Sequence, residues 1–293
     1  MGRAWRCAGL RWATEGPVLL WDGGRRSPLA RGKRVAFAVV EGGVRGCVGA
    51  RGHACPVRAA VSARSTGARC EECARLDRAH SVAADGIADD PRPYRVYLAW
   101  FGPGLVKVGI TAAGRGPARL LEQGAVCFSW LGSGPLMAAR RTEELLRAAL
   151  RVPDRIPYAE KRAVRARLPR DGEERVREIR EVHGRAVELP QWPDSLTRAP
   201  FEAVDHLRVF GLDTAPAARG EVTELVAGAV VSGELVAAAG PDLHLAGGDG
   251  VIVLDTRLMR GWELVPAGSE GGSGARLPVR EFREEGHAQD GLF

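Results

Sequence analysis

The chain has 293 residues, 45% of them hydrophobic, which suits two or three modest domains. No apolar run reaches the roughly 18 residues that a membrane span requires, and the N-terminus lacks the apolar stretch of a secretory signal. We therefore expect a cytoplasmic protein without membrane contact. The net charge of +6 fits an anionic partner such as nucleic acid. Lysine is scarce beside arginine, however, and GC-rich coding produces the same bias without selection for binding.

Residues 1–80 combine short strands with a cysteine cluster. Val18–Trp21 and Val35–Val40 are apolar stretches separated by glycine-rich turns, which predicts a pair of strands. Four cysteines follow in the pattern C-x7-C-x14-C-x2-C: Cys47, Cys55, Cys70 and Cys73.

The cysteine pattern predicts a structural zinc site. A C-x2-C pair places two thiolates on one turn, and a second pair completes a tetrahedral set without an open position. The surrounding sequence is rich in glycine and arginine, so metal binding would supply much of its folding free energy. His53 is an alternative to Cys47 as a ligand. A disulfide or a redox-active pair fits a cytosolic setting less well.

After a polar linker at residues 81–93, the segment 94–189 predicts an α+β core followed by basic helices. Two apolar runs, Tyr94–Phe101 and Leu105–Ile110, flank a Gly-Pro-Gly turn and therefore predict a β-hairpin. We expect Gly109 to permit a close approach near the end of the second strand.

The rest of the core alternates helix and strand. Pro117 opens a short helix that Gly124 closes. Ala125–Leu131 returns as a third strand, in which Cys127 is a packed apolar side chain. Pro135–Leu150 is a longer helix with one apolar face. The residues expected on that face are Met137, Thr142, Leu145, Leu146 and Ala149.

Polar groups capable of chemistry stand at the ends and edges of these elements: Tyr97, Lys107, Arg115, Arg119 and Glu143. Phosphodiester hydrolysis needs cations to neutralise the developing charge and a base or a metal to activate water. Lys107 can act as a phosphate ligand, or as a base if desolvation lowers its pKa. Glu143 is preferred to Glu144 because, at about 100° per residue, it borders the apolar face. Packing for the tyrosine and solvated helix faces for the charges are the structural alternatives.

The last third of the chain changes character. Arg151–Arg185 holds ten arginines and one lysine, but interspersed glutamates make part of this stretch a solvated helix face. Residues 190–202 predict a linker, and 203–266 predict a small β-barrel or sandwich of short strands. Residues 267–293 predict a disordered tail. No P-loop, G-x-S-x-G elbow or H-E-x-x-H motif occurs.

The strand–strand–helix–strand–helix order, with VYL on the first strand and KVGIT on the second, resembles the GIY-YIG nuclease superfamily. The combination of cysteine cluster, VYL…KVGIT…RLLEQGA core and β tail is similar to the bacterial "domain of unknown function 2797" family. This resemblance implies a three-stranded antiparallel sheet with flanking helices. It also implies that Tyr97 assists deprotonation of water, that Arg119 steadies the phosphate, and that Glu143 holds Mg²⁺ or Mn²⁺.

Two departures from the nuclease pattern leave two functions in competition. Lys107 stands where the nucleases place a tyrosine, and Gln123 stands where many carry histidine. Both changes favour a non-catalytic, zinc-stabilised platform for nucleic acid. Retention of Tyr97, Arg119 and a helix glutamate favours a metal-dependent endonuclease acting on DNA or RNA. We take the endonuclease, with Lys107 as a fourth site residue, as the prediction.

Overall fold

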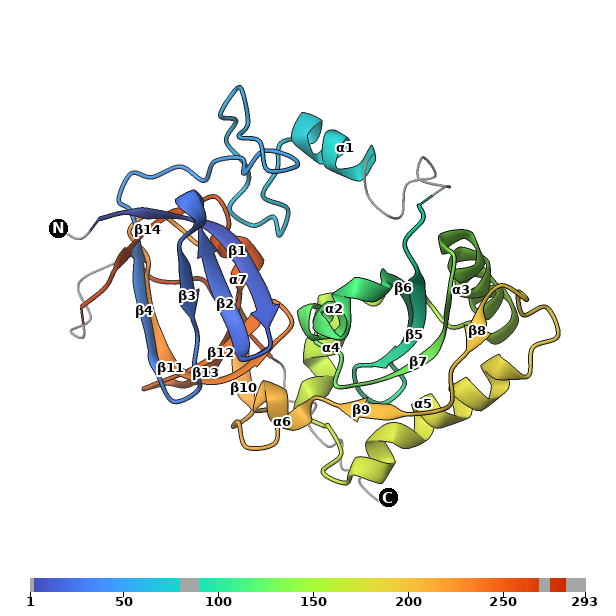
Figure 1. The fold of residues 1–293 in the computed structure, drawn as a ribbon. Helices are drawn as coiled ribbons and strands as arrows, with labels where there is room; N and C mark the ends of the chain where they lie inside the picture. The colour runs from blue at the N-terminus through green and yellow to red at the C-terminus, as the bar shows by residue number, and fades with distance from the viewer. Residues whose placement is uncertain (1–2, 80–89, 269–274, 283–293) are drawn as a thin grey trace, which may run out of the picture.

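Strands from both ends of the chain form one ten-stranded sheet in the computed structural model, which describes residues 3–79, 90–268 and 275–282. The strands from the start of the chain are β1 (Trp5–Ala13), β2 (Gly16–Trp21), β3 (Arg26–Pro28) and β4 (Arg34–Val39). Those from its end are β10 (Ala218–Val222), β11 (Val230–Ala239), β12 (Asp242–Gly247), β13 (Gly250–Asp255), β14 (Glu263–Pro266) and β15 (Val279–Glu281). We call this unit the β lobe (Figure 1, blue and orange strands).

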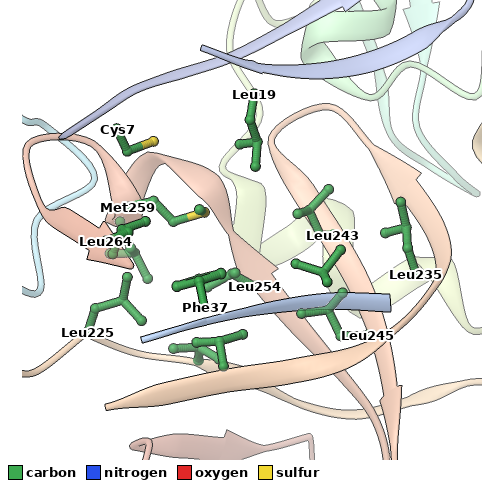
Figure 2. Close-up of a cluster of buried hydrophobic side chains, with 14 of the residues drawn as sticks. Cys7, Leu19, Phe37, Leu225, Leu235, Leu243, Leu245, Leu254, Met259 and Leu264 are labelled. Atoms are coloured by element: carbon green, nitrogen blue, oxygen red, sulfur yellow. The ribbon is translucent and has the colours of Figure 1, made fainter. Parts of the chain in front are cut away.

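Alternating burial explains how these strands close on a core. In β4, Val35, Phe37 and Val39 are buried while the residues between them are more exposed, as the two-residue period of a strand requires. β4 pairs antiparallel with β11 on one side and with β14 on the other. Figure 2 shows the result, with Leu19 and Phe37 lying among leucines from the last third of the chain.

This pairing corrects the expected organisation. The strands of residues 1–80 and 203–266 belong to one sheet, and no separate C-terminal barrel forms in the described residues. β9 (Ala203–Asp205), from the start of the expected barrel, and β8 (Thr197–Arg198), from the expected linker at 190–202, both pair with the core. Within the tail expected to be disordered, β15 pairs with β10, while 269–274 and 283–293 lie outside the described residues. Such pairings join strands about 200 residues apart, which local patterns do not encode.

A second sheet lies in the core lobe, which we define as residues 90–205. Its order is β6-β5-β7-β8, with β9 pairing with β7 further along the same strand. The strands β5 (Tyr94–Trp100) and β6 (Val106–Ala112) form the predicted hairpin, and β7 (Cys127–Gly134) pairs antiparallel with β5. The expected sheet of three strands is therefore widened to five by β8 and β9. The α+β class with antiparallel sheets is confirmed.

Helices cover both faces of the core sheet (Figure 1). They are η2 (Ala113–Arg115), α2 (Ala118–Gln123), α3 (Leu136–Leu150), α4 (Tyr158–Arg165) and α5 (Gly172–Val187). The residues that α3 buries are Leu136, Ala138, Ala139, Thr142 and Leu146. Met137 is 40% exposed and Ala149 is also exposed, so the predicted face was wrong at these two positions. The helix starts directly after β7, and its rotation follows from docking rather than from its own pattern.

The cysteine segment, which we define as residues 40–79, is fastened to the β lobe by a buried arginine. Arg45 is 1% exposed, and its guanidinium donates hydrogen bonds to four backbone carbonyls. Two of these carbonyls, at Ser62 and Ser65, lie in the cysteine segment. The other two, at Arg257 and Arg260, lie around the short helix α7 (Thr256–Met259). The segment ends in α1 (Glu71–Ala79), which lies above the two lobes in Figure 1.

Ion pairs fasten α4 to the β lobe. Arg162 contacts the carboxylates of Glu221, Asp242 and Asp255, at 2.8, 2.5 and 2.6 Å. Arg165 contacts Asp242 at 2.5 Å, and the Asp242 side chain is fully buried. Two guanidiniums from one short helix thus meet three carboxylates of the neighbouring sheet. The position of α4 is fixed by both lobes.

Candidate functional site

The four predicted cysteines converge on one point. The Sγ atoms of Cys47, Cys55, Cys70 and Cys73 all lie within 4.8 Å of one another, and none forms a disulfide. The Cys55 and Cys70 sulfurs are 4.0 Å apart. Thiolates held about 2.3 Å from a tetrahedral zinc lie about 3.8 Å apart, so this spacing suits a metal ion such as zinc.

The backbone around the cysteines also suits thiolate ligands. The amides of Gly49 and Cys70 donate to the Cys47 sulfur at 3.3 and 3.2 Å, which would stabilise negative charge there. Three of the four cysteines are buried. His53, the alternative ligand, is exposed and does not belong to the group. Four sulfurs arranged in this way could hold a metal ion such as zinc.

Tyr97 lies on the face of the core sheet that packs against α2. In the strand register it stands opposite Gly109 of β6 and Trp130 of β7. Its side chain is 2% exposed, and its hydroxyl oxygen accepts a hydrogen bond of 2.8 Å from the Gln123 amide. Burial raises the pKa of Tyr97, while Gln123 and Arg119 oppose that rise. The phenol therefore stays protonated at neutral pH.

Gly109 is required by the position of this ring. A Cβ atom at Gly109 would lie 2.3 Å from the Tyr97 hydroxyl and 2.5 Å from the carbon that bears it. The predicted close approach is confirmed, and its reason is that the tyrosine side chain lies across the second strand.

Lys107 reaches the same face from β6. Its side chain is buried, with 8% exposed, and its ammonium donates to the Asp154 carbonyl at 3.0 Å. The nitrogen lies 5.8 Å from the centre of the Tyr97 ring. Burial, and then the nearby Arg119 cation, lower the pKa of Lys107 to about 8, against the opposing influence of Glu143.

Glu143 projects from α3 at the edge of this face. It is half-buried whereas Glu144 is exposed, as the helical geometry predicted. Burial raises the pKa of Glu143, and the nearby Asp154 carboxylate raises it further, while Lys107 opposes them. Arg119 on α2 is exposed, and its guanidinium lies 4.0 Å from the carboxylate of Glu122.

The four predicted side chains lie within electrostatic reach of one another, and the Lys107 nitrogen is 5.8 Å from the centre of the Tyr97 ring. Arg119 and Glu143 both act on Tyr97 and on Lys107, and Lys107 acts on Glu143. They come from β5, β6, α2 and α3, four separate elements. Arg115 instead contacts Glu122 at 2.5 Å.

Sequence reasoning missed two residues beside these four. Asp154 follows α3 in a loop that runs along the edge of β6, where its carbonyl meets Lys107 and its carboxylate acts on Glu143. Lys161 of α4 donates a hydrogen bond to the backbone carbonyl of Gln123. Neither belongs to a motif. The one available signal was that lysine occurs only three times in the chain.

Several arginines of the basic stretch have structural partners. Arg162 and Arg165 pair with the β lobe, and Arg175 contacts Asp205 at 2.5 Å. These three are therefore not available to a phosphate backbone in this conformation. Arg155 and Arg170 are exposed.

Comparison with known proteins places the chain in a family. The family described as "Protein of unknown function (DUF2797)" matches residues 32–264, and the chain belongs to it. The match spans the cysteine segment, the core lobe and most of the β lobe. No curated protein and no solved structure matches the chain. Across the described ranges, no helix combines the length and apolar character needed to cross a membrane.

Proposed function

We propose that the chain is a metal-dependent endonuclease whose GIY-YIG-like core hydrolyses phosphodiester bonds of DNA or RNA. The observation that carries this proposal is the meeting of Tyr97, Lys107, Arg119 and Glu143. The guanidinium and the carboxylate act on the pKa of the phenol and of the amine, and the amine acts on that of the carboxylate, although the four groups come from four elements. Several groups with perturbed pKa values that act on one another are a recognised signal of a candidate reactive site.

The pKa shifts support one assignment of the proton transfers. With a pKa of about 8, Lys107 is neutral in roughly a tenth of molecules at pH 7, and in that form it accepts a proton from water. Tyr97 remains a phenol, so it donates a hydrogen bond to the attacking water or to the phosphate rather than acting as a base. The exposed Arg119 guanidinium contacts the phosphate oxygens and neutralises the charge that develops there.

The carboxylates fit a divalent cation. Glu143 and Asp154 lie close enough for one to raise the pKa of the other, and a cation between them would relieve that repulsion. Mg²⁺ or Mn²⁺ binds such oxygen ligands and keeps several waters. When bound, the ion would polarise the phosphate and lower the pKa of a bound water. Zinc in the four-cysteine site has a structural role in this proposal.

The test is cleavage of a supercoiled plasmid and of a labelled oligonucleotide by purified protein with MgCl₂ or MnCl₂. Glu143→Ala should abolish cleavage, whereas the matched control Glu144→Ala should retain it, because Glu144 is exposed on the same helix. Cleavage that persists in Glu143→Ala would remove this residue from the metal site. Absence of any cleavage by the wild-type protein would overturn the proposal.

The second candidate is a zinc-stabilised platform that binds nucleic acid without cleaving it. The burial of Tyr97 favours it, because only 2% of that residue is exposed and its oxygen already accepts a bond from Gln123. Tight binding of the same oligonucleotide without cleavage, weakened by Arg119→Ala, would support the platform.

A further inference from the structure

Lys161 is the least expected buried charge of the core lobe. It is 3% exposed, and its nitrogen lies 3.8 Å from the centre of the Phe101 ring and 4.3 Å from that of Tyr158. It donates a hydrogen bond of 3.2 Å to the carbonyl of Gln123. Within the described ranges no carboxylate pairs with it.

Stability does not explain a lysine in this slot. Burial, and then repulsion by Lys107 and Arg165, lower the pKa of Lys161 to about 7. The charged form is therefore less favourable here than in water, and an apolar side chain of similar length would fill the space between two rings without that penalty. What the nitrogen adds beyond its contacts with the two rings is the hydrogen bond to the Gln123 carbonyl.

Lys161 contacts the end of α2, the helix whose last residue is hydrogen-bonded to Tyr97 of β5. Gln123 is the last residue of α2, and its side-chain amide donates to the Tyr97 hydroxyl oxygen at 2.8 Å. Because that oxygen is the acceptor, the hydroxyl proton remains free to point towards a substrate. Lys161 thus holds the backbone of the residue that orients the phenol.

The β lobe holds both α4, which carries Lys161, and the end of α2, which carries Gln123. Arg162 and Arg165, adjacent to Lys161 on α4, are ion-paired with buried carboxylates. Gly240, in the turn between β11 and β12, packs so closely on the end of α2 that a Cβ atom there would lie 3.0 Å from the carbonyl carbon of Gln123. The β lobe therefore supports the position of Gln123 directly and through α4.

We propose that Lys161 is a positioning residue that holds Gln123, and through it the Tyr97 hydroxyl, in the orientation the site requires. This inference rests on the proposed function for its catalytic consequence. Its structural core, the coupling of Lys161 to the Gln123–Tyr97 hydrogen bond, is testable without any cleavage.

The kinetic test is a double-mutant cycle on oligonucleotide cleavage with MnCl₂. Lys161→Met and Gln123→Ala should each lower kcat about tenfold with little change in KM, because only the reacting geometry is disturbed. The double variant should be no slower than the slower single variant. Lys33→Met, which changes the exposed lysine of the β lobe, is the control and should match wild type. Losses that multiply in the double variant would show that Lys161 does not act through Gln123.

The second test uses side-chain amide NMR, for which this chain is unusually suited. It contains three glutamines and no asparagine, so an amide spectrum holds three NH₂ pairs, and Gln123→Ala identifies the pair of interest. In wild type, this pair should be shifted and protected from exchange by its bond to Tyr97. Lys161→Met should move it towards free glutamine, and Lys33→Met should not. An unchanged Gln123 signal in folded Lys161→Met overturns the inference.

The two tests separate the possible failures. If wild type cleaves nothing but the Gln123 signal responds to Lys161→Met, the proposed function fails and the positioning role stands. If Lys161→Met does not fold, Tyr97→Phe in the wild-type background provides the remaining measurement. Loss of the Gln123 shift in that variant supports the hydrogen bond on which the inference depends, and its persistence refutes it.

Discussion

Replacing Gly109 by alanine should displace Tyr97 without changing any polar group. The new Cβ atom would lie 2.3 Å from the Tyr97 hydroxyl oxygen and 2.5 Å from Cζ. To restore ordinary contacts of roughly 3.5 Å, the tip of the ring must retreat by about 1 Å. A shift of that size away from Gln123 would take the 2.8 Å bond beyond hydrogen-bond range. Misplacement by about 1 Å lowers a catalytic rate about 100-fold.

The assay is oligonucleotide cleavage with MnCl₂, followed as kcat, with thermal unfolding measured in parallel. Gly109→Ala should lose about 100-fold in kcat and about 1–3 kcal/mol of stability from overpacking. Gly114→Ala is the matched control, because a Cβ there meets nothing within 4 Å, and it should change neither quantity. Tyr97→Phe should reproduce the kinetic loss. If Tyr97→Phe is slow while Gly109→Ala is as fast as wild type, ring position does not govern activity and the reasoning fails.

Three further results are expected. The pKa of Lys107 is lowered to about 8, so a base role predicts that kcat rises about tenfold per pH unit below pH 8 and is constant above it. Lys107→Met should remove this pH dependence. A rate that falls above pH 8 would instead indicate that Lys107 acts as a charged phosphate ligand. Purified protein should carry about one equivalent of zinc by elemental analysis. Cys73→Ser should lose the zinc and melt at a lower temperature, whereas His53→Ala should retain it. Metal-free wild type would contradict the zinc site. Asp242→Asn should lower the free energy of unfolding in urea by about 3–5 kcal/mol, because two guanidiniums lose a buried partner. The control Asp249→Asn, at a carboxylate 91% exposed, should change it by no more than about 0.5 kcal/mol. Equal effects would mean that the buried pairs are not important for stability.

The structure changes the interpretation of one departure from the nuclease pattern. In the sequence, Gln123 is notable for the proton-transfer group that it lacks. In the fold it is 7% exposed and donates to the Tyr97 oxygen, with its own carbonyl held by Lys161. A histidine side chain can change its charge with pH, whereas an amide remains a hydrogen-bond donor at every pH. The amide therefore opposes the rise that burial causes in the pKa of Tyr97, and the groups whose pKa burial brings towards neutrality are Lys107 and Lys161.

The sequence by itself determined the features that depend on near neighbours. The Gly-Pro-Gly turn specified the hairpin of β5 and β6, and helical periodicity placed Glu143 at the border of burial and Glu144 in solvent. The metal-ligand pattern identified four cysteines whose sulfurs converge. Each result follows from turn chemistry, from a helical period or from ligand number, all of which are written in short stretches of chain.

Only the tertiary structure decided what distant segments do together. The pairing of β4 with β11 and β14, which joins the two ends of the chain, depends on long-range register that local patterns leave open. The same is true of Asp154 and Lys161, which belong to no motif and acquire a role through the loop and helix that carry them to Lys107 and Gln123. Burial sets the pKa of both lysines, and burial is a property of the packed fold.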